Sequence, residues 1–168
     1  MILIDRSGAV TEDPWDYPRE GRDLLHSQHT NSERIVVRLE QWGEFESRFG
    51  ASASGIWVFA EQDAGSLVPL LDHVELIVVE FRASRDGRGF TLARMLRERH
   101  HFEGDIRAAG PLLPDQFAVL LQCGYTSLLA SSRVPLIRWR DAAVSLDKVK
   151  TKPRTFLDRL SRQGGGEH

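Results

Sequence analysis

One uninterrupted apolar run constrains the fold of this chain more than any other feature. The run is Leu76-Ile77-Val78-Val79, with no polar residue inside it. A strand with one face in water alternates apolar and polar residues, whereas a continuous run requires burial on both faces. Such strands are typical of parallel sheets that are covered by helices.

The segments around this run alternate between strand and helix patterns. Parallel neighbours need crossover connections, so this alternation favours βαβ units. The sequence therefore predicts a single α/β domain with a mainly parallel sheet of about five strands and covering helices. An open doubly wound sheet and a partial β/α barrel both fit. The expected strands are 34–39, 56–60, 76–79, 105–109 and 125–130, with Leu136 to Trp139 as an added edge piece, and the expected helices are 40–49, 66–73, 90–102 and 114–123.

The two ends differ in composition from the α/β domain, which we place at residues 33–140. Residues 1–32 are predicted to be an N-terminal arm that is partly irregular, because most of it is polar and contains prolines. Ile2-Leu3-Ile4 fits a short strand, and we expect Trp15 and Tyr17 to pin the arm to the body. Residues 141–168 are predicted to be a C-terminal helical stretch followed by a flexible tail.

Composition excludes some classes of function. The chain has 168 residues and a formal net charge of −2, which gives no general attraction to nucleic acid. The single cysteine, Cys123, allows no disulfide within the chain and fits a reducing compartment. No apolar run approaches the roughly 18 residues of a membrane span. We therefore expect a cytoplasmic protein with no membrane or nucleic-acid partner.

A first candidate site is the loop Asp86-Gly87-Arg88-Gly89, between a strand pattern and a helix pattern. Glycines allow positive φ angles and close approach of a ligand, and a helix N-terminus attracts anions. Arg88 adds a planar group suited to oxyanions, so sulfite, sulfate, a nucleotide or flavin phosphate, or a sirohaem propionate would fit. No particular cofactor is indicated. Alternatively, Asp86 caps the helix and Arg88 pairs with a neighbouring carboxylate.

Arg107, Asp115 and Gln116 form a second candidate group, near the end of the next strand and the start of its helix. Loops that follow parallel strands share one edge of the sheet, so both groups are expected there. Arg107 could bind an oxyanion, with Asp115 as a proton carrier. Alternatively, Arg107 forms a buried ion pair with Asp86 or Asp115, because buried charges need partners.

Two arginines of the third expected helix, Arg94 and Arg97, are candidates for binding an acidic partner, because they share a face. The alternative is a solvated surface with an Arg94–Glu98 pair. Cys123 falls near a helix end, which disfavours a reactive thiolate and favours a small core residue. His26 and His29 lack a carboxylate or cysteine cluster at zinc spacing, so no metal site is expected.

The stretch from about Leu76 to Tyr125 resembles a bacterial family known as domain of unknown function 934. The matching residues are Asp86-Gly87-Arg88-Gly89-Phe90 with the following arginine-rich helix, then Ile106-Arg107-Ala108, Asp115-Gln116 and Cys123-Gly124-Tyr125. This resemblance implies a link with assimilatory sulfate reduction, since members are typically encoded beside sulfite reductase. We therefore expect an accessory protein that binds sulfite reductase or its electron donor. The alternative is a small oxidoreductase-like enzyme or a sensor that binds an oxyanion, flavin or nucleotide, and whether the protein is an enzyme stays open.

Overall fold

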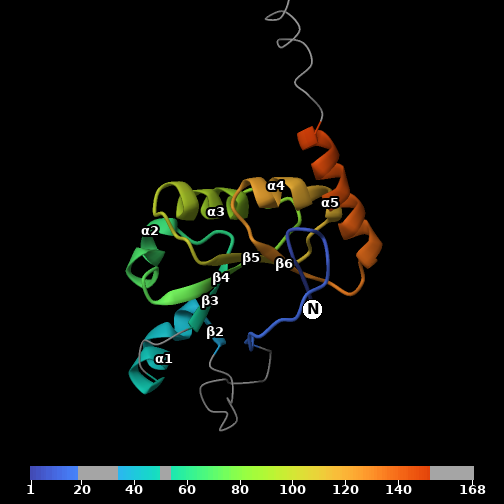
Figure 1. Cartoon of the computed structure of the whole chain (residues 1–168). Coiled ribbons are helices and arrows are strands. Elements are labelled where there is room, and N and C mark those ends of the chain that lie inside the picture. Colours follow the sequence, from blue (N-terminus) through green and yellow to red (C-terminus); the bar gives the residue numbers. More distant parts are fainter. Residues whose placement is uncertain (19–33, 50–53, 152–168) are drawn as a thin grey trace, which may run out of the picture.

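The computed structural model of the protein describes residues 1–18, 34–49 and 54–151 and shows a six-stranded sheet with packed helices (Figure 1). The strands are β1 (Ile2–Ile4), β2 (Ile35–Arg38), β3 (Ser54–Phe59), β4 (Val74–Glu80), β5 (Asp105–Ala109) and β6 (Ser127–Ala130). The α-helices are α1 (Trp42–Phe49), α2 (Ala64–Leu67), α3 (Arg88–Glu98), α4 (Phe117–Gln122) and α5 (Leu136–Thr151). Short 3₁₀ helices cover Leu39–Gln41, Val68–Leu70 and Pro114–Gln116.

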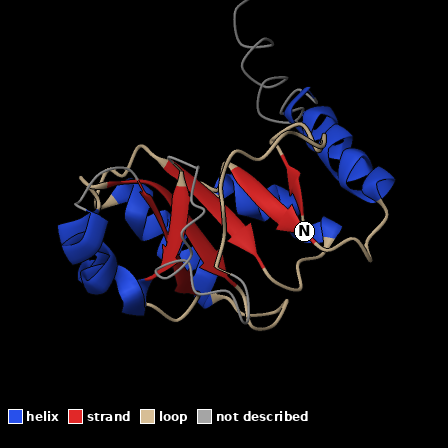
Figure 2. Cartoon of the chain, turned by 90° about the horizontal axis from the view of Figure 1, so that it is seen from below, coloured by secondary structure: helices blue, strands red, loops and turns tan. Residues whose placement is uncertain are grey.

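The predicted α/β fold is confirmed, with one strand more than expected. The strand order is β1-β6-β5-β4-β3-β2, in which β2 to β6 are parallel and β1 is antiparallel to β6 (Figure 2). Right-handed crossovers that always step in the same direction place their helices on the same face of a sheet. A doubly wound sheet reverses its strand order instead. Of the two predicted arrangements, the observed order is that of a partial β/α barrel.

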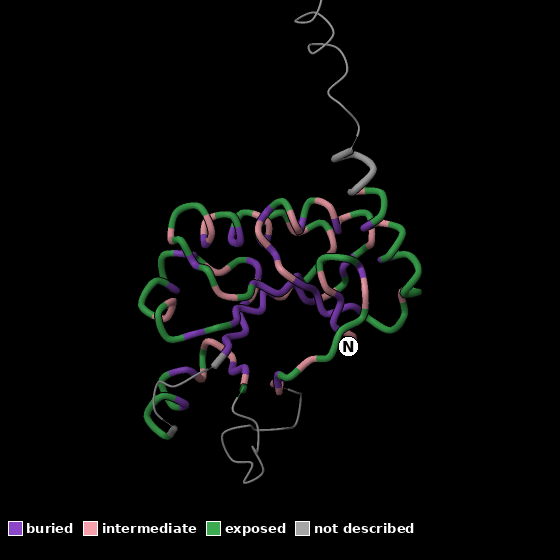
Figure 3. The backbone as a smooth tube through the Cα atoms, in the orientation of Figure 1, coloured by how far each residue is buried: buried purple, intermediate pink, exposed green. Residues whose placement is uncertain are grey.

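The sheet therefore has two different faces. All five α-helices contribute buried side chains to the apolar core on one face, and α3 and α4 lie above the sheet in Figure 1. The second core cluster contains no α-helical residue and consists of Leu3, Trp15, Tyr17, Val36, Trp57, Leu76, Val78, Ala109 and Leu129. Figure 3 shows the buried part of the backbone running through the middle of the fold. We call the side that holds the second cluster the second face of the sheet.

The segment before β2 takes the place of helices on the second face. The apolar run of β4 is buried on both sides, as predicted, but helices cover only one side. Trp15 and Tyr17 are buried against the other side, which confirms that these two aromatic residues pin the N-terminal segment to the body. His26 and His29 lie outside the described residues.

The prediction of an added edge strand at Leu136 to Trp139 is wrong, because these residues begin helix α5. Leu136 and Ile137 are exposed, whereas Trp139 and Ala143 are buried, and this i, i+4 spacing is helical. Trp139 packs edge-on against Phe117 of α4, with ring centroids 6.2 Å apart. The tail predicted to follow the C-terminal helical stretch lies outside the described residues.

Candidate functional site

The loop between β4 and α3 holds Asp86 and Arg88 in a closed ion pair. One carboxylate oxygen of Asp86 accepts from the backbone N–H of Arg88 at 3.1 Å and from its Nε at 2.9 Å, and the other accepts from a terminal guanidinium nitrogen at 2.8 Å. These side-chain hydrogen bonds lower the pKa of Asp86. The alternative drawn from the sequence is therefore right that Arg88 pairs with a neighbouring carboxylate, but wrong that Asp86 caps the helix, because the N-cap residue of α3 is Gly87. An incoming anion would have to compete with Asp86 for Arg88.

The glycines of this loop do not adopt the positive φ angles that the sequence suggested. Gly87 has a φ angle of −65°, and positive φ angles occur in the described glycines at Gly8, Gly110 and Gly124. Gly89 instead allows close packing, because a Cβ atom there would lie 2.4 Å from the ring of Phe81. The carbonyl of Gly89 also accepts a hydrogen bond from the buried hydroxyl of Tyr125 at 2.7 Å. Gly89 therefore joins the start of α3 to the core.

The second predicted loop meets the first, but Arg88 and Asp115 line different pockets. The side-chain amide of Gln116 donates to the carbonyl oxygen of Ser84, which ties the two loops together. Asp115, however, lines a pocket of ≈ 470 Å³ between α4 and α5. Arg88 lines a different pocket of ≈ 600 Å³, whose other walls include Glu61, Asp63, Gly87 and Thr91. The two groups share the carboxyl edge of the sheet but face separate spaces.

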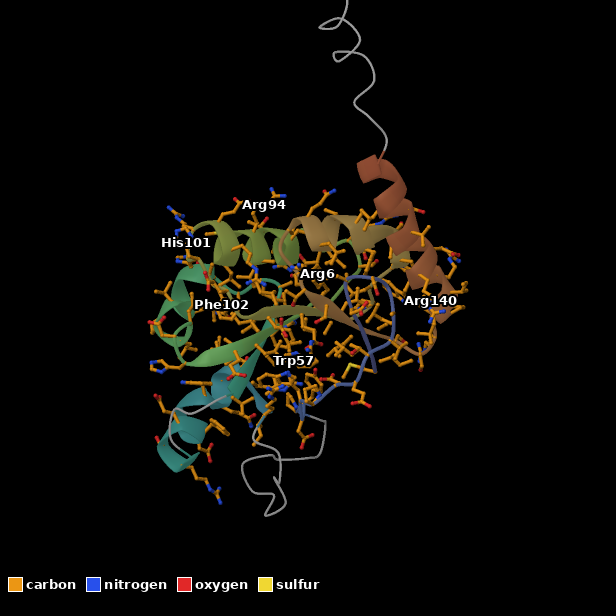
Figure 4. The ribbon with its side chains drawn as sticks, viewed as in Figure 1. Arg6, Trp57, Arg94, His101, Phe102 and Arg140 are labelled. Carbon is orange, nitrogen blue, oxygen red and sulfur yellow. The ribbon has the colours of Figure 1, made fainter. Side chains whose placement is uncertain are left out.

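Arg94 and Arg97 share a face of α3, as predicted, because both reach the turn after α4, at Cys123 and Gly124, but only Arg94 is exposed. Arg97 donates from Nε to the carbonyl of Gly124 at 3.0 Å and from one terminal nitrogen to the carbonyls of Phe102 and Gly104. This arginine therefore fastens the end of α3 to two neighbouring turns. Arg94 is 57% exposed and lies 3.9 Å from Glu98, and Figure 4 shows it on the outer side of the helical layer.

Arg107 lies on the second face, and the prediction that it pairs with Asp86 or Asp115 is wrong. It is only 3% exposed. Its Nε donates to the hydroxyl of Ser127 at 2.9 Å, and one terminal nitrogen donates to a carboxylate oxygen of Asp13 at 3.0 Å and to the hydroxyl of Tyr17. Because side chains alternate along a strand, Arg107 faces away from the helices that carry the two loops.

Two further residues give the second face a polar edge. The indole N–H of Trp57 in β3 donates to a carboxylate oxygen of Glu80 in β4 at 2.6 Å. The ring of Tyr17 packs edge-on against Trp57, with centroids 5.9 Å apart. The sequence did not identify Trp57, Glu80, Asp13 or Ser127 as candidate residues. Strand alternation would have placed Arg107 and Ser127 on one face, but no local signal links them to Asp13.

The remaining candidates belong to the packed layers. Cys123 is buried at the end of α4, and a guanidinium nitrogen of Arg94 lies 3.6 Å from its sulfur. Within residues 1–18, 34–49 and 54–151, no group of three or more His, Cys, Asp and Glu side chains is placed to hold a metal ion. The same described residues contain no helix with the length and hydropathy needed to span a bilayer.

Comparison with known proteins gives one result. No curated protein and no solved structure matches the chain. A family model described as bacterial protein of unknown function (DUF934) matches residues 55–150, which span the sheet from β3 to β6 and nearly all of α5. This match covers more than half of the chain and includes both candidate loops. The chain therefore belongs to the DUF934 family of bacterial proteins.

Proposed function

We propose that the protein is an accessory protein of assimilatory sulfate and sulfite reduction that binds sulfite reductase or its electron donor. The sulfur link comes from the family resemblance. A binding role, rather than catalysis, is supported by the closed Asp86–Arg88 pair and by the separate pockets at Arg88 and Asp115. In this arrangement the arginines hold structure or face solvent, and they do not converge on one reacting group.

The observation that carries the proposal is a row of exposed arginines along α3 and the loop before it. The row contains Arg85, Arg88, Arg94 and Arg99. Arg88 is paired with Asp86, and Arg94 has a distant contact with Glu98, whereas the described part of the chain offers no ion pair to Arg85 or Arg99. We call this set the α3 arginine row. A basic row of this kind attracts an acidic surface and accelerates its encounter.

The test measures binding to purified sulfite reductase and to its electron donor at low and at moderate salt. Reversing two charges in the variant Arg94→Glu/Arg99→Glu should weaken the complex by about tenfold or more, mainly through slower association. Arg138→Glu/Arg140→Glu is the matched control, because it also reverses two exposed arginines, and these lie on α5, away from the row (Arg140 is labelled in Figure 4). If neither protein binds at either salt, the proposal is wrong.

A second candidate function rests on the pocket of ≈ 600 Å³ beside Arg88, because its volume is that of a small-molecule site. An oxyanion, nucleotide or flavin there would make the protein a small oxidoreductase-like enzyme or a sensor. The acidic wall formed by Glu61 and Asp63 disfavours an anion, which ranks this candidate second. Thermal shifts with sulfite, adenosine monophosphate and flavin mononucleotide test it, since a bound ligand raises the melting temperature.

A further inference from the structure

The second face of the sheet is a largely apolar surface with a charged centre. Its buried apolar residues come from all six strands and from Trp15 and Tyr17, and Arg107 lies among them with 3% of its surface exposed. A buried guanidinium needs hydrogen-bonding partners and opposite charge. Ser127 supplies one partner from the sheet itself, and the others come from residues 13–17. We call this segment, Asp13-Pro14-Trp15-Asp16-Tyr17, the strap.

The strap is attached to the sheet as a bound peptide would be. Within the strap, Asp16 donates its N–H to the carbonyl of Arg34 at 3.0 Å, and its own carbonyl accepts from the N–H of Val36 at 2.8 Å, so it extends the sheet beyond β2. The two flanking aromatic residues, Trp15 and Tyr17, are buried. Main-chain pairing at a sheet edge, with side chains in pockets, is a general mode of peptide recognition.

The strap contacts only one of the two terminal guanidinium nitrogens of Arg107 through a carboxylate. Only one terminal nitrogen of Arg107 meets Asp13, whose second carboxylate oxygen accepts from the hydroxyl of Tyr17 at 2.7 Å. The other terminal nitrogen lies 4.0 Å from a carboxylate oxygen of Asp105, which is beyond hydrogen-bond range. A pocket of ≈ 240 Å³ lies beside this arginine. A carboxylate placed there could bind both terminal nitrogens, which is the stronger arrangement.

We propose that the second face is a binding surface for an extended acidic–aromatic segment of a partner protein, and that the strap occupies this surface in cis. The partner's carboxylate pairs with Arg107, its aromatic side chain packs on Trp57, and its backbone pairs with β2. This inference concerns a different surface from the α3 arginine row and does not depend on it. Exchange of the strap for the partner segment would expose the N-terminal residues.

The strap and a free peptide compete for the second face, and the strap has the advantage because it is part of the same chain. A tethered segment acts at an effective concentration of the order of millimolar, so a free peptide with the same contacts binds the intact protein weakly. Weakening the strap should therefore improve binding of the free peptide. The variant Asp13→Asn/Tyr17→Phe suits this purpose because it removes the charge and the hydroxyl but keeps both aromatic rings in the core.

The probe is a fluorescently labelled peptide with the sequence of residues 10–18. We expect it to bind the variant at least tenfold more tightly than the unaltered protein, and we expect the same peptide carrying Asp13→Asn and Tyr17→Phe to bind both proteins poorly. Circular dichroism establishes that the variant is folded. If the variant is not folded, binding of both peptides to the unaltered protein is measured instead, by fluorescence anisotropy with the protein and peptide at millimolar concentration. Equal binding of both peptides, or no binding to a folded protein, overturns the proposal.

Discussion

The substitution Gly89→Ala tests whether the start of α3 is held against the core by direct contact. The added Cβ would lie 2.4 Å from one carbon of the Phe81 ring and 2.6 Å from another. An ordinary contact begins near 3.4 Å, so the ring would have to move by about 1 Å. The ring is fully buried and touches Phe90 and Tyr125, with centroids at 5.3 and 6.0 Å, so it has little room to move.

The expected magnitude follows from two opposing contributions. Overpacking a core typically costs about 1–3 kcal/mol, and a ring held on two sides favours the upper end of this range. Alanine gains about 1 kcal/mol over glycine in helix propensity. The net loss for Gly89→Ala is therefore about 2 kcal/mol in the free energy of unfolding, or roughly 4–8 °C in melting temperature for a domain of this size.

Gly43→Ala is the matched control, because it makes the same change in α1, where a Cβ would meet no atom within 4 Å. This variant should be more stable than the unaltered protein by about 0.5–1 kcal/mol. Urea unfolding followed by tryptophan fluorescence gives both free energies. In addition, Phe81→Leu should destabilise the Gly89→Ala protein less than it destabilises the unaltered one, since the two sites are coupled. The packing argument fails if Gly89→Ala unfolds at the same or a higher urea concentration than the unaltered protein.

Three further changes give results that other contacts in the structure predict. Arg97→Met should lower the free energy of unfolding by about 2–4 kcal/mol, because it strips three carbonyl oxygens of a charged donor; urea unfolding measures this loss. Burial raises the pKa values of both tyrosines, Tyr17 and Tyr125, so their contribution to stability is complete below about pH 10 and is lost as the pH rises further. Ultraviolet titration should accordingly show no tyrosinate in the native protein near pH 10, and a free-tyrosine curve would contradict this. The bonds from Arg88 lower the pKa of Asp86, so this pair stabilises the protein above about pH 4 and less as the pH falls through the lowered pKa; in an NMR titration, Arg88→Met should return the pKa of Asp86 toward its usual value.

The sheet could be predicted from the sequence because its strands carry strong local patterns. The strand at residues 105–109 has the bounds that the sequence indicated, and the run Leu76-Ile77-Val78-Val79 is buried on both faces as expected. The start of helix α5 could not be predicted from residues 136–139 alone, because the three apolar side chains in this stretch also fit a strand. Only the burial of Trp139 and Ala143 separates the two interpretations, and burial depends on the packing of α4.

The candidate site was harder to predict. Arg107, Asp86 and Asp115 were grouped because all three were expected near the same edge of the sheet, but the side chain of Arg107 lies on the opposite face. Side chains alternate along β5, so Arg107 points to the face opposite to the one that holds Ile106 and Ala108. From that face it cannot reach a pocket among the helices. Its carboxylate partner must come from whatever covers the second face. Because helices cover only one face of the sheet, the residue that pairs with Arg107 has to come from a segment outside the βαβ units. That residue is Asp13, which is 94 residues away in the sequence. A buried charge on the face opposite the helices thus indicates that the segment covering it carries the complementary charge, even where no local pattern marks that segment.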